Sequence, residues 1–165
     1  MTQIKGKVWK FGDNINTDVM APGFVFNAPW EEVKKVILHI HPRFSKEVGP
    51  GDVIVAGKNW GCGSSREQAT SNLKKLGLGC VVAESFGRIF FRNSVALALP
   101  GIVCPGVSKA FEEGEELELD LEIARVRNTT RGTELQGEPL SRDMLAIIAK
   151  GGIIPAMRER LRIKK

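Results

Sequence analysis

Two serines and an arginine near the middle of the chain are the side chains whose types and spacing could do chemistry. Ser64, Ser65 and Arg66 follow a turn that contains Gly61 and Gly63, and a helix is expected to start at the serines. Glycines let the backbone turn sharply and come close to a small ligand. A helix N-terminus offers free N–H groups and partial positive charge, and an arginine beside it can bind a carboxylate or a phosphate. The combination indicates an anion site.

The same serines also fit a purely structural role. Ser64-x-x-Glu67 and Ser65-x-x-Gln68 both match the capping box, in which a serine side chain only starts a helix. The spacing departs from the usual nucleotide loops, because no lysine precedes the serines and no GxGxxG string is present. The residues alone therefore leave an anion site and a helix cap as alternatives.

Buried strands and helices of an α/β domain must position these residues. Residues 53–56 are apolar on both faces, which is typical of a buried parallel strand. Residues 80–83 repeat this pattern after the expected helix, so strand, helix and strand form a parallel crossover. Further strands are predicted at residues 4–11, 101–104, 117–121, 123–127 and 132–135, and further helices at residues 29–38, 86–99, 139–150 and 154–164.

Three stretches of the chain resemble the small, swivelling domain of the aconitase superfamily. They read KFGDNINTD at residues 10–18, GCGSSRE at 61–67 and AESFGRIFFRN at 83–93, in the expected order. The likeness covers nearly the whole chain and is strongest to the small subunits of 3-isopropylmalate dehydratase and homoaconitase-like enzymes. It implies a single domain over residues 1–165 with a three-layer β/β/α swivelling fold: a mixed sheet, a parallel βαβ core and flanking antiparallel strands.

The resemblance also implies an activity and a set of site residues. Members of the family are hydro-lyases that move a hydroxyl between neighbouring carbons of a malate-type acid by removing water and adding it back. The matching positions make Ser64 the catalytic base, place Asp18 beside it at the active site, and assign Arg66, with Ser65 and Gly63, to substrate binding. A serine is a poor base unless its alkoxide is stabilised, which a helix N-terminus and Arg66 would do.

Residues 19–28 correspond to the loop that meets the variable end of the substrate in this family. Relatives that use tricarboxylates place an arginine there, whereas this loop has no positive charge and carries Phe24, Val25 and Phe26. A third carboxylate would be left unpaired, and an unpaired buried charge is costly. We therefore expect 3-isopropylmalate, interconverted with 2-isopropylmalate in leucine biosynthesis. A homoaconitate or dimethylmalate hydratase small subunit is the alternative.

The cysteines and histidines do not predict a metal site in this chain. Cys62, Cys80 and Cys104 lack the tight spacing of a local iron–sulfur or zinc site. His39 and His41 could share one face of a strand, but no third ligand is evident. The family holds a 4Fe–4S cluster in a large subunit, so this chain is expected to bind no cofactor or metal itself and to be active only with that iron–sulfur partner.

Composition disfavours several other classes of protein. The net charge of +5 is concentrated in residues 158–165, which hold five basic residues and one acidic residue. A nucleic-acid-binding protein usually spreads its basic residues over a folded face, so nucleic-acid binding is disfavoured. No apolar run is long enough to span a bilayer, and residues 1–5 lack the apolar core of a signal peptide. Cytoplasmic location is expected, and a non-catalytic module that binds an organic anion or a partner remains a rival hypothesis.

Overall fold

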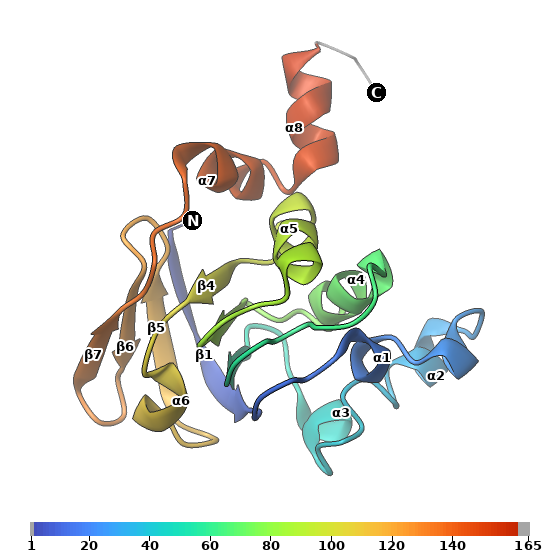
Figure 1. The fold of residues 1–165 in the computed structure, drawn as a ribbon, viewed down its shortest axis with the longest axis horizontal. Helices are drawn as coiled ribbons and strands as arrows, with labels where there is room; N and C mark the ends of the chain where they lie inside the picture. Colours follow the sequence, from blue (N-terminus) through green and yellow to red (C-terminus); the bar gives the residue numbers. More distant parts are fainter. Residues whose placement is uncertain (1, 162–165) are drawn as a thin grey trace.

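The computed structural model describes residues 2–161, and a seven-stranded sheet runs through this part of the chain (Figure 1). The strand order is β4-β3-β2-β1-β5-β6-β7. The strands are β1 (Gln3–Lys10), β2 (Val53–Ala56), β3 (Cys80–Ala83), β4 (Gly101–Val103), β5 (Glu116–Asp120), β6 (Arg125–Asn128) and β7 (Thr133–Gln136).

Strand β1 joins a parallel half of the sheet to an antiparallel half. Its C-terminal part pairs in parallel with β2, with Val8 opposite Val53, and the parallel pairing continues through β3 to β4. Its N-terminal part pairs antiparallel with β5, with Gly6 opposite Leu117, and β6 and β7 continue that pattern. The sheet is therefore mixed, as the sequence predicts.

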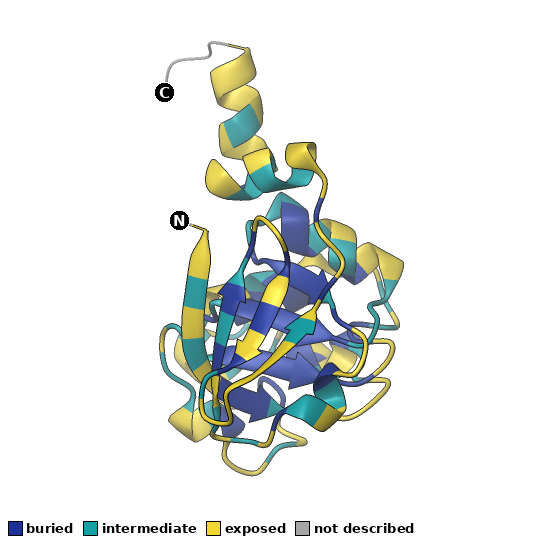
Figure 2. Cartoon of the chain, turned by 90° about the vertical axis from the view of Figure 1, so that its left-hand side faces the viewer, coloured by how far each residue is buried: buried dark blue, intermediate teal, exposed yellow. Residues whose placement is uncertain are grey.

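Two hydrophobic cores lie on opposite faces of the parallel half. The sheet curls so that its antiparallel half covers one face, and helices cover the other (Figures 1 and 2). Because neighbouring residues of a strand point to opposite faces, Val8 enters the core between the two halves and Trp9 enters the core under the helices. The layers are sheet, sheet and helices, which confirms the predicted β/β/α arrangement.

Most of the helices are short, and two of them pack directly on the parallel strands. Leu73 of α4 and Phe90 of α5 are buried against Ile54 and Val81 in the core under the helices. The helices are α1 (Thr17–Met20), α2 (Trp30–Val33), α3 (Phe44–Glu47), α4 (Glu67–Lys75), α5 (Arg88–Ala96), α6 (Val107–Ala110), α7 (Arg142–Ala149) and α8 (Ile153–Arg160), with a 3₁₀ turn η1 (Gly23–Val25). Helix α8 points away from the sheet and is largely exposed (Figure 2).

The strands predicted at residues 4–11, 53–56, 80–83, 101–104, 117–121, 123–127 and 132–135 are present within a few residues of their predicted bounds, but several helical predictions differ from the structure. The helix predicted at residues 29–38 ends at Val33, because residues 34–40 form turns and Leu38 has a φ of +52°. The strand suggested for His39 and His41 is wrong for the same reason, since His39 lies in these turns and His41 in the bend that follows. The end of the helix predicted at 154–164 lies partly outside the described residues, as does part of the basic tail.

The loop predicted at residues 12–29 contains two short helical segments, α1 and η1. Helix α1 begins where Asn16 Oδ1 accepts the backbone N–H groups of Asp18 and Val19, at 2.9 and 3.3 Å. The Asn16 cap stabilises the start of this helix. The sequence did not reveal the helix, because four residues are too few to show an apolar period. Within residues 2–161, no helix is both long and apolar enough to cross a membrane.

Candidate active site

Three loops that follow parallel strands lie side by side at the carboxyl edge of the sheet. Asn16, beyond β1, forms an isolated parallel bridge with Cys62, beyond β2, and Trp60 forms another with Phe86, beyond β3. The backbone N–H of Thr17 also donates to the Cys62 carbonyl, at 2.9 Å. The three stretches that carry the family resemblance are thus brought together, at the edge where open α/β sheets usually bind ligands.

Gly61 fixes the path of the loop that carries the serines. Its φ is +75°, and a Cβ atom built at this position would lie 2.3 Å from Cγ of Phe90 on α5. Gly87 is also tightly packed, since a Cβ there would lie 2.8 Å from the Gly61 carbonyl oxygen. This close packing requires glycine at position 61. The residues that follow it lie beside the start of α1, where Cys62 pairs with Asn16 and its carbonyl accepts the Thr17 backbone N–H.

Ser64 is held by a buried hydroxyl from the neighbouring loop. Ser64 Oγ lies 3.0 Å from Oγ1 of Thr17, and the Ser64 backbone N–H donates to the same Thr17 oxygen at 3.1 Å. Thr17 is 1% exposed, whereas Ser64 is partly exposed and Ser65 is fully at the surface. Sequence reasoning did not single out Thr17; the available signal was its position directly before Asp18 in the first stretch.

Helix α4 begins after the serines rather than at them. Its first residue is Glu67, its N-cap residue is Arg66 in an extended conformation, and no side chain caps it. The capping-box interpretation of Ser64 and Ser65 is therefore wrong, because the loop stays extended where Thr17 takes the Ser64 N–H. Among the described residues, no acceptor takes the backbone N–H groups of Ser65 or Arg66.

Arg66 lies between the first loop and the start of the predicted specificity loop. Its Nη1 is 3.9 Å from Oδ1 of Asp18 and donates to the Ala21 carbonyl at 3.4 Å. The Arg66 and Asp18 side chains are 41% and 70% exposed, so the pair is loose and the guanidinium can still bind an anion. The turn at the start of α1 is closed by Asn16 and not by Asp18, because Asn16 Oδ1 accepts the backbone N–H groups of Asp18 and Val19.

The side chains of the predicted specificity loop, residues 19–28, point in different directions. Gly23 lies beside Arg66, since a Cβ at Gly23 would be 3.8 Å from Arg66 Nη1. Val25 and Phe26 line a hollow of about 210 Å³ whose other walls include Trp30 of α2. Phe24 points outward and is 79% exposed, and it does not line the hollow. The structure thus brings Val25 and Phe26 together at the hollow, but Phe26 is still 56% exposed, and Phe24 lies in solvent.

Two of the three cysteines are poorly suited to hold iron. Cys80 and Cys104 are buried in the core between the two halves of the sheet. Burial raises the pKa of the Cys80 thiol to about 12 and, with the nearby Glu84 carboxylate, that of Cys104 to about 11, so both stay protonated rather than becoming thiolate ligands. No cluster of three His, Cys, Asp or Glu side chains that could hold a metal ion occurs between residues 2 and 161.

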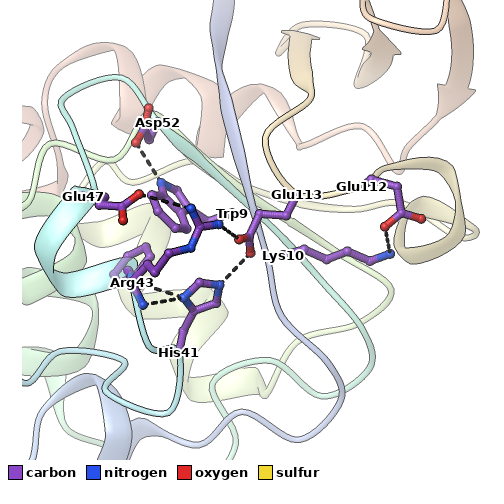
Figure 3. Close-up of polar contacts among 9 residues, drawn as sticks. Trp9, Lys10, His41, Arg43, Glu47, Asp52, Glu112 and Glu113 are labelled. Carbon is purple, nitrogen blue, oxygen red and sulfur yellow. Dashed lines mark hydrogen bonds and ion pairs between the residues drawn. The ribbon is translucent and has the colours of Figure 1, made fainter.

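His41 takes part in a structural network next to α3 and the end of β1 (Figure 3). Its Nδ1 accepts the backbone N–H groups of Arg43 and Phe44 at 3.2 and 3.1 Å, so Nε2 carries the proton and donates to Glu113 at 2.6 Å. Arg43 also bonds Glu113, at 2.7 Å. This network ties α3 to the segment that leads into β5.

Comparison with known proteins gives consistent matches over nearly the whole chain. The Aconitase C-terminal domain family matches residues 11–104, which include every candidate site residue. The chain is 46% identical to the isopropylmalate/citramalate isomerase small subunit of Methanocaldococcus jannaschii, over 96% of this chain and 95% of that protein. It is 47% identical to the 3-isopropylmalate dehydratase small subunit 1 of Methanopyrus kandleri, over 94% and 92% of the two chains.

A solved structure agrees with these sequence matches. The crystal structure of a 3-isopropylmalate dehydratase from Methanocaldococcus jannaschii superposes with a TM-score of 0.90 at 36% sequence identity. The match covers 98% of this chain and 96% of that one. The curled mixed sheet and its helices are therefore shared with that protein along almost the entire chain.

Proposed function

The chain belongs to the family of 3-isopropylmalate dehydratase small subunits, which are hydro-lyase subunits of the aconitase superfamily, and from this we propose its reaction. We propose that it interconverts 3-isopropylmalate and 2-isopropylmalate, together with an iron–sulfur large subunit in the cytoplasm. In this division of labour the small subunit contributes the base and part of the carboxylate-binding site.

The observation that carries this proposal is the position of the Ser64 hydroxyl. It lies in the loop after β2, with Thr17 on one side and Arg66 two residues further along the chain. It is partly exposed, so a substrate held by a partner subunit can reach it. A hydroxyl at the carboxyl edge of a parallel sheet, beside free backbone N–H groups and a guanidinium, is suited to act on an anionic substrate.

The proposed chemistry is a dehydration followed by a rehydration. Ser64 Oγ, as the alkoxide, takes the proton from the carbon next to a substrate carboxylate, and the C–H electron pair becomes the second bond of an alkene. The hydroxyl of the neighbouring carbon leaves with its bonding pair and becomes water by taking a proton from a general acid on the large subunit. In the rehydration, the oxygen of water adds to the carbon that lost its proton, the water gives its spare proton back to that acid, and Ser64 delivers its proton to the carbon that lost the hydroxyl. When bound in the large subunit, the 4Fe–4S cluster of this family supplies the Lewis acid for the leaving hydroxyl.

Arg66 and Asp18 support this reaction through charge. Negative charge builds up on the substrate carboxylate as the proton leaves, and the Arg66 guanidinium is suited to bind that carboxylate with two hydrogen bonds. Asp18 forms a loose ion pair with Arg66, at 3.9 Å, and so lies beside the guanidinium at the site. Ser65 and Gly63 contribute backbone and hydroxyl contacts beside the base.

The proposed substrate follows from the loop of residues 19–28. The loop carries Phe24, Val25 and Phe26 and no basic residue, which favours an apolar isopropyl group over a third carboxylate. Citramalate, with a methyl group in place of isopropyl, is a second candidate because the relative from Methanocaldococcus jannaschii is named for both acids. Homoaconitate and dimethylmalate are less well matched alternatives.

A reconstitution assay tests the proposal. The chain is combined with a large subunit from its own organism, and hydration of the alkene intermediate is followed with isopropyl, methyl and carboxylate-bearing substrates. Ser64→Ala is expected to lower kcat by about 100-fold or more while the two subunits still assemble. The matched control is Ser71→Ala, which removes a partly exposed serine on α4 outside the site.

Two results would contradict the proposal. An active Ser64→Ala complex would remove Ser64 from the role of base. If instead the isolated chain were stabilised against unfolding by malate-type acids, and a cluster-bearing large subunit gave no activity, the chain would be a binding module.

A further inference from the structure

Thr17 is the buried polar residue of the site, and the structure fixes it from several directions. Its side chain is 1% exposed at the first position of α1. Its backbone N–H donates to the Cys62 carbonyl at 2.9 Å, and Asn16 caps the helix that it begins. The Thr17 hydroxyl therefore has little freedom, and it faces the loop that carries Ser64.

The hydrogen bonds around Thr17 Oγ1 decide which way its proton points. This oxygen accepts the Ser64 backbone N–H at 3.1 Å, which fixes it as an acceptor in one direction. Its own proton then has two neighbouring acceptors: Ser64 Oγ at 3.0 Å and the Ser64 carbonyl oxygen at 3.5 Å. The shorter contact is the better hydrogen bond. An alkoxide can only accept, so deprotonation of Ser64 makes the donor role of Thr17 obligatory.

We propose that Thr17 is a positioning residue for the reaction, which donates its hydroxyl proton to Ser64 Oγ, fixes its rotamer and stabilises its alkoxide. This inference rests on the proposed function of Ser64 as the base. Thr17 does not touch the reacting carbon; it acts through the Ser64 oxygen. From the sequence alone, the helix N-terminus and Arg66 were expected to stabilise the alkoxide, and Thr17 was not considered.

The burial of Thr17 makes its contribution different from that of Arg66. Arg66 is 41% exposed and 3.9 Å from Asp18, so solvent and a carboxylate both reduce its effect on Ser64. A hydrogen bond to a charged oxygen from a buried donor is short, directional and little screened. Preorganised donors of this kind stabilise developing negative charge without reorganising during the reaction.

The first test uses pH profiles of the two-subunit enzyme. Thr17→Val keeps the side-chain shape and removes the hydroxyl, and Thr17→Ser keeps the hydroxyl. Loss of a hydrogen bond to a charged group predicts that Thr17→Val lowers kcat by about 10- to 100-fold. The acid limb of the kcat/KM profile should move to higher pH by about one pH unit or more, because the base is harder to deprotonate. Thr17→Ser, which keeps the hydroxyl, should have the wild-type kcat and the wild-type acid limb.

A merely structural role would give a different result. Damage to the loop lowers activity at every pH and leaves the limb in place, and that result in Thr17→Val would overturn the proposal. If Thr17→Val does not assemble, Thr17→Ala compared with Thr17→Ser makes the same comparison with smaller side chains. Equal profiles for those two variants would also overturn it.

The second test needs no partner subunit. In the isolated chain, Ser64→Cys in a Cys62→Ala background places a thiol at the position of the base. The pH dependence of its alkylation by iodoacetamide reports the pKa of that thiol. Adding Thr17→Val should raise this pKa by about one pH unit or more, because the thiolate loses its donor. An unchanged pKa would overturn the proposal.

Two controls separate this inference from the proposed function. Thr70 on α4 is also a fully buried threonine, so Thr70→Val is the matched substitution and should leave the pH profile unchanged. If Ser64→Ala abolishes activity and Thr17→Val leaves the profile in place, Ser64 is the base and only the role of Thr17 fails. If Ser64→Ala is active, the proposed function itself fails.

Discussion

The parallel and antiparallel halves of the sheet have different roles in this molecule. Strands β2 and β3 of the parallel half are buried on both faces, whereas β6 of the antiparallel half alternates between buried and exposed residues (Figure 2). Every candidate site residue lies in a connection that follows a parallel strand. The antiparallel half contributes Leu117, Leu119 and Val126 to the core on the other face.

The lengths of the connections explain this division. Parallel strands can be joined only by long crossovers, here residues 11–52, 57–79 and 84–100. Those crossovers return the chain past the carboxyl edge of the sheet and leave room there for polar segments. Antiparallel neighbours need only short turns, here residues 121–124 and 129–132. The family match at residues 11–104 ends before the antiparallel strands β5, β6 and β7 begin.

The largest expected difference between the halves comes from two glycines with almost the same φ. Gly61 has a φ of +75° and no room for a Cβ, while Gly132 has a φ of +73° and nothing within 4 Å of that position. Gly61→Ala should cost about 3 kcal/mol or more of folding stability, from steric overlap with Phe90 and an unfavourable φ. Gly132→Ala should cost only about 1 kcal/mol.

Urea unfolding of both glycine variants measures this contrast. Similar losses of stability would mean that the loop at Gly61 can shift without disturbing α5, and that the parallel half is less tightly packed than its backbone indicates.

Substitutions of two exposed arginines test whether only the parallel half of the sheet contributes residues to catalysis. Arg66→Gln removes the guanidinium at the site and should lower kcat/KM of the two-subunit enzyme by about 100-fold, with little change in stability because the side chain is partly exposed. Arg127→Gln on the exposed face of β6 should change neither. Steady-state kinetics with both variants checks this, and an equal effect would end the functional distinction between the halves.

The network around Glu113 joins the two halves, and its contribution should depend on pH (Figure 3). Burial opposes ionisation of this carboxyl, but hydrogen bonds from His41 and Arg43 outweigh it and hold the pKa of Glu113 below its ordinary value of 4.5. A lowered folded-state pKa stabilises the fold above the unfolded-state pKa, and this stability is lost as the pH falls through the folded-state value.

Glu113→Gln should therefore reduce stability by about 1–2 kcal/mol at neutral pH. The gap between wild type and variant should close as the pH drops below about 4.5. Urea unfolding at a series of pH values measures the gap, and a gap that stayed constant with pH would show that the charge of Glu113 is unimportant.

The smallest expected effect separates the two buried threonines of the helical layer. Thr70 Oγ1 is buried with no hydrogen-bond partner among the described residues, in contrast to the bonded hydroxyl of Thr17. Thr70→Val removes this unpaired group at nearly constant volume and should raise stability by up to about 1 kcal/mol, with unchanged kinetics. Thermal unfolding measures the gain, and a loss of stability would indicate a partner for Thr70 that this structure does not contain.

Sequence reasoning succeeded where a feature is encoded locally and failed where it is not. The continuous apolar runs at β2 and β3 and the alternation at β5 and β6 predicted those strands closely. Helix α1 has only four residues and depends on a cap from Asn16, so no period revealed it. The serines matched a capping box, but the capping residue of α4 is Arg66, because Ser64 is already engaged by Thr17.

The sequence by itself determined the strands, the glycine-containing turn before the serines, and membership of the family through three short stretches. Only the tertiary structure decided that the Ser64 hydroxyl meets Thr17 and that Arg66 reaches Asp18 and the loop after it. The physical reason is that Thr17 and Ser64 are 47 positions apart and meet because β1 and β2 pair in parallel, in a register set by the burial of both strands. No local pattern in the chain encodes that pairing.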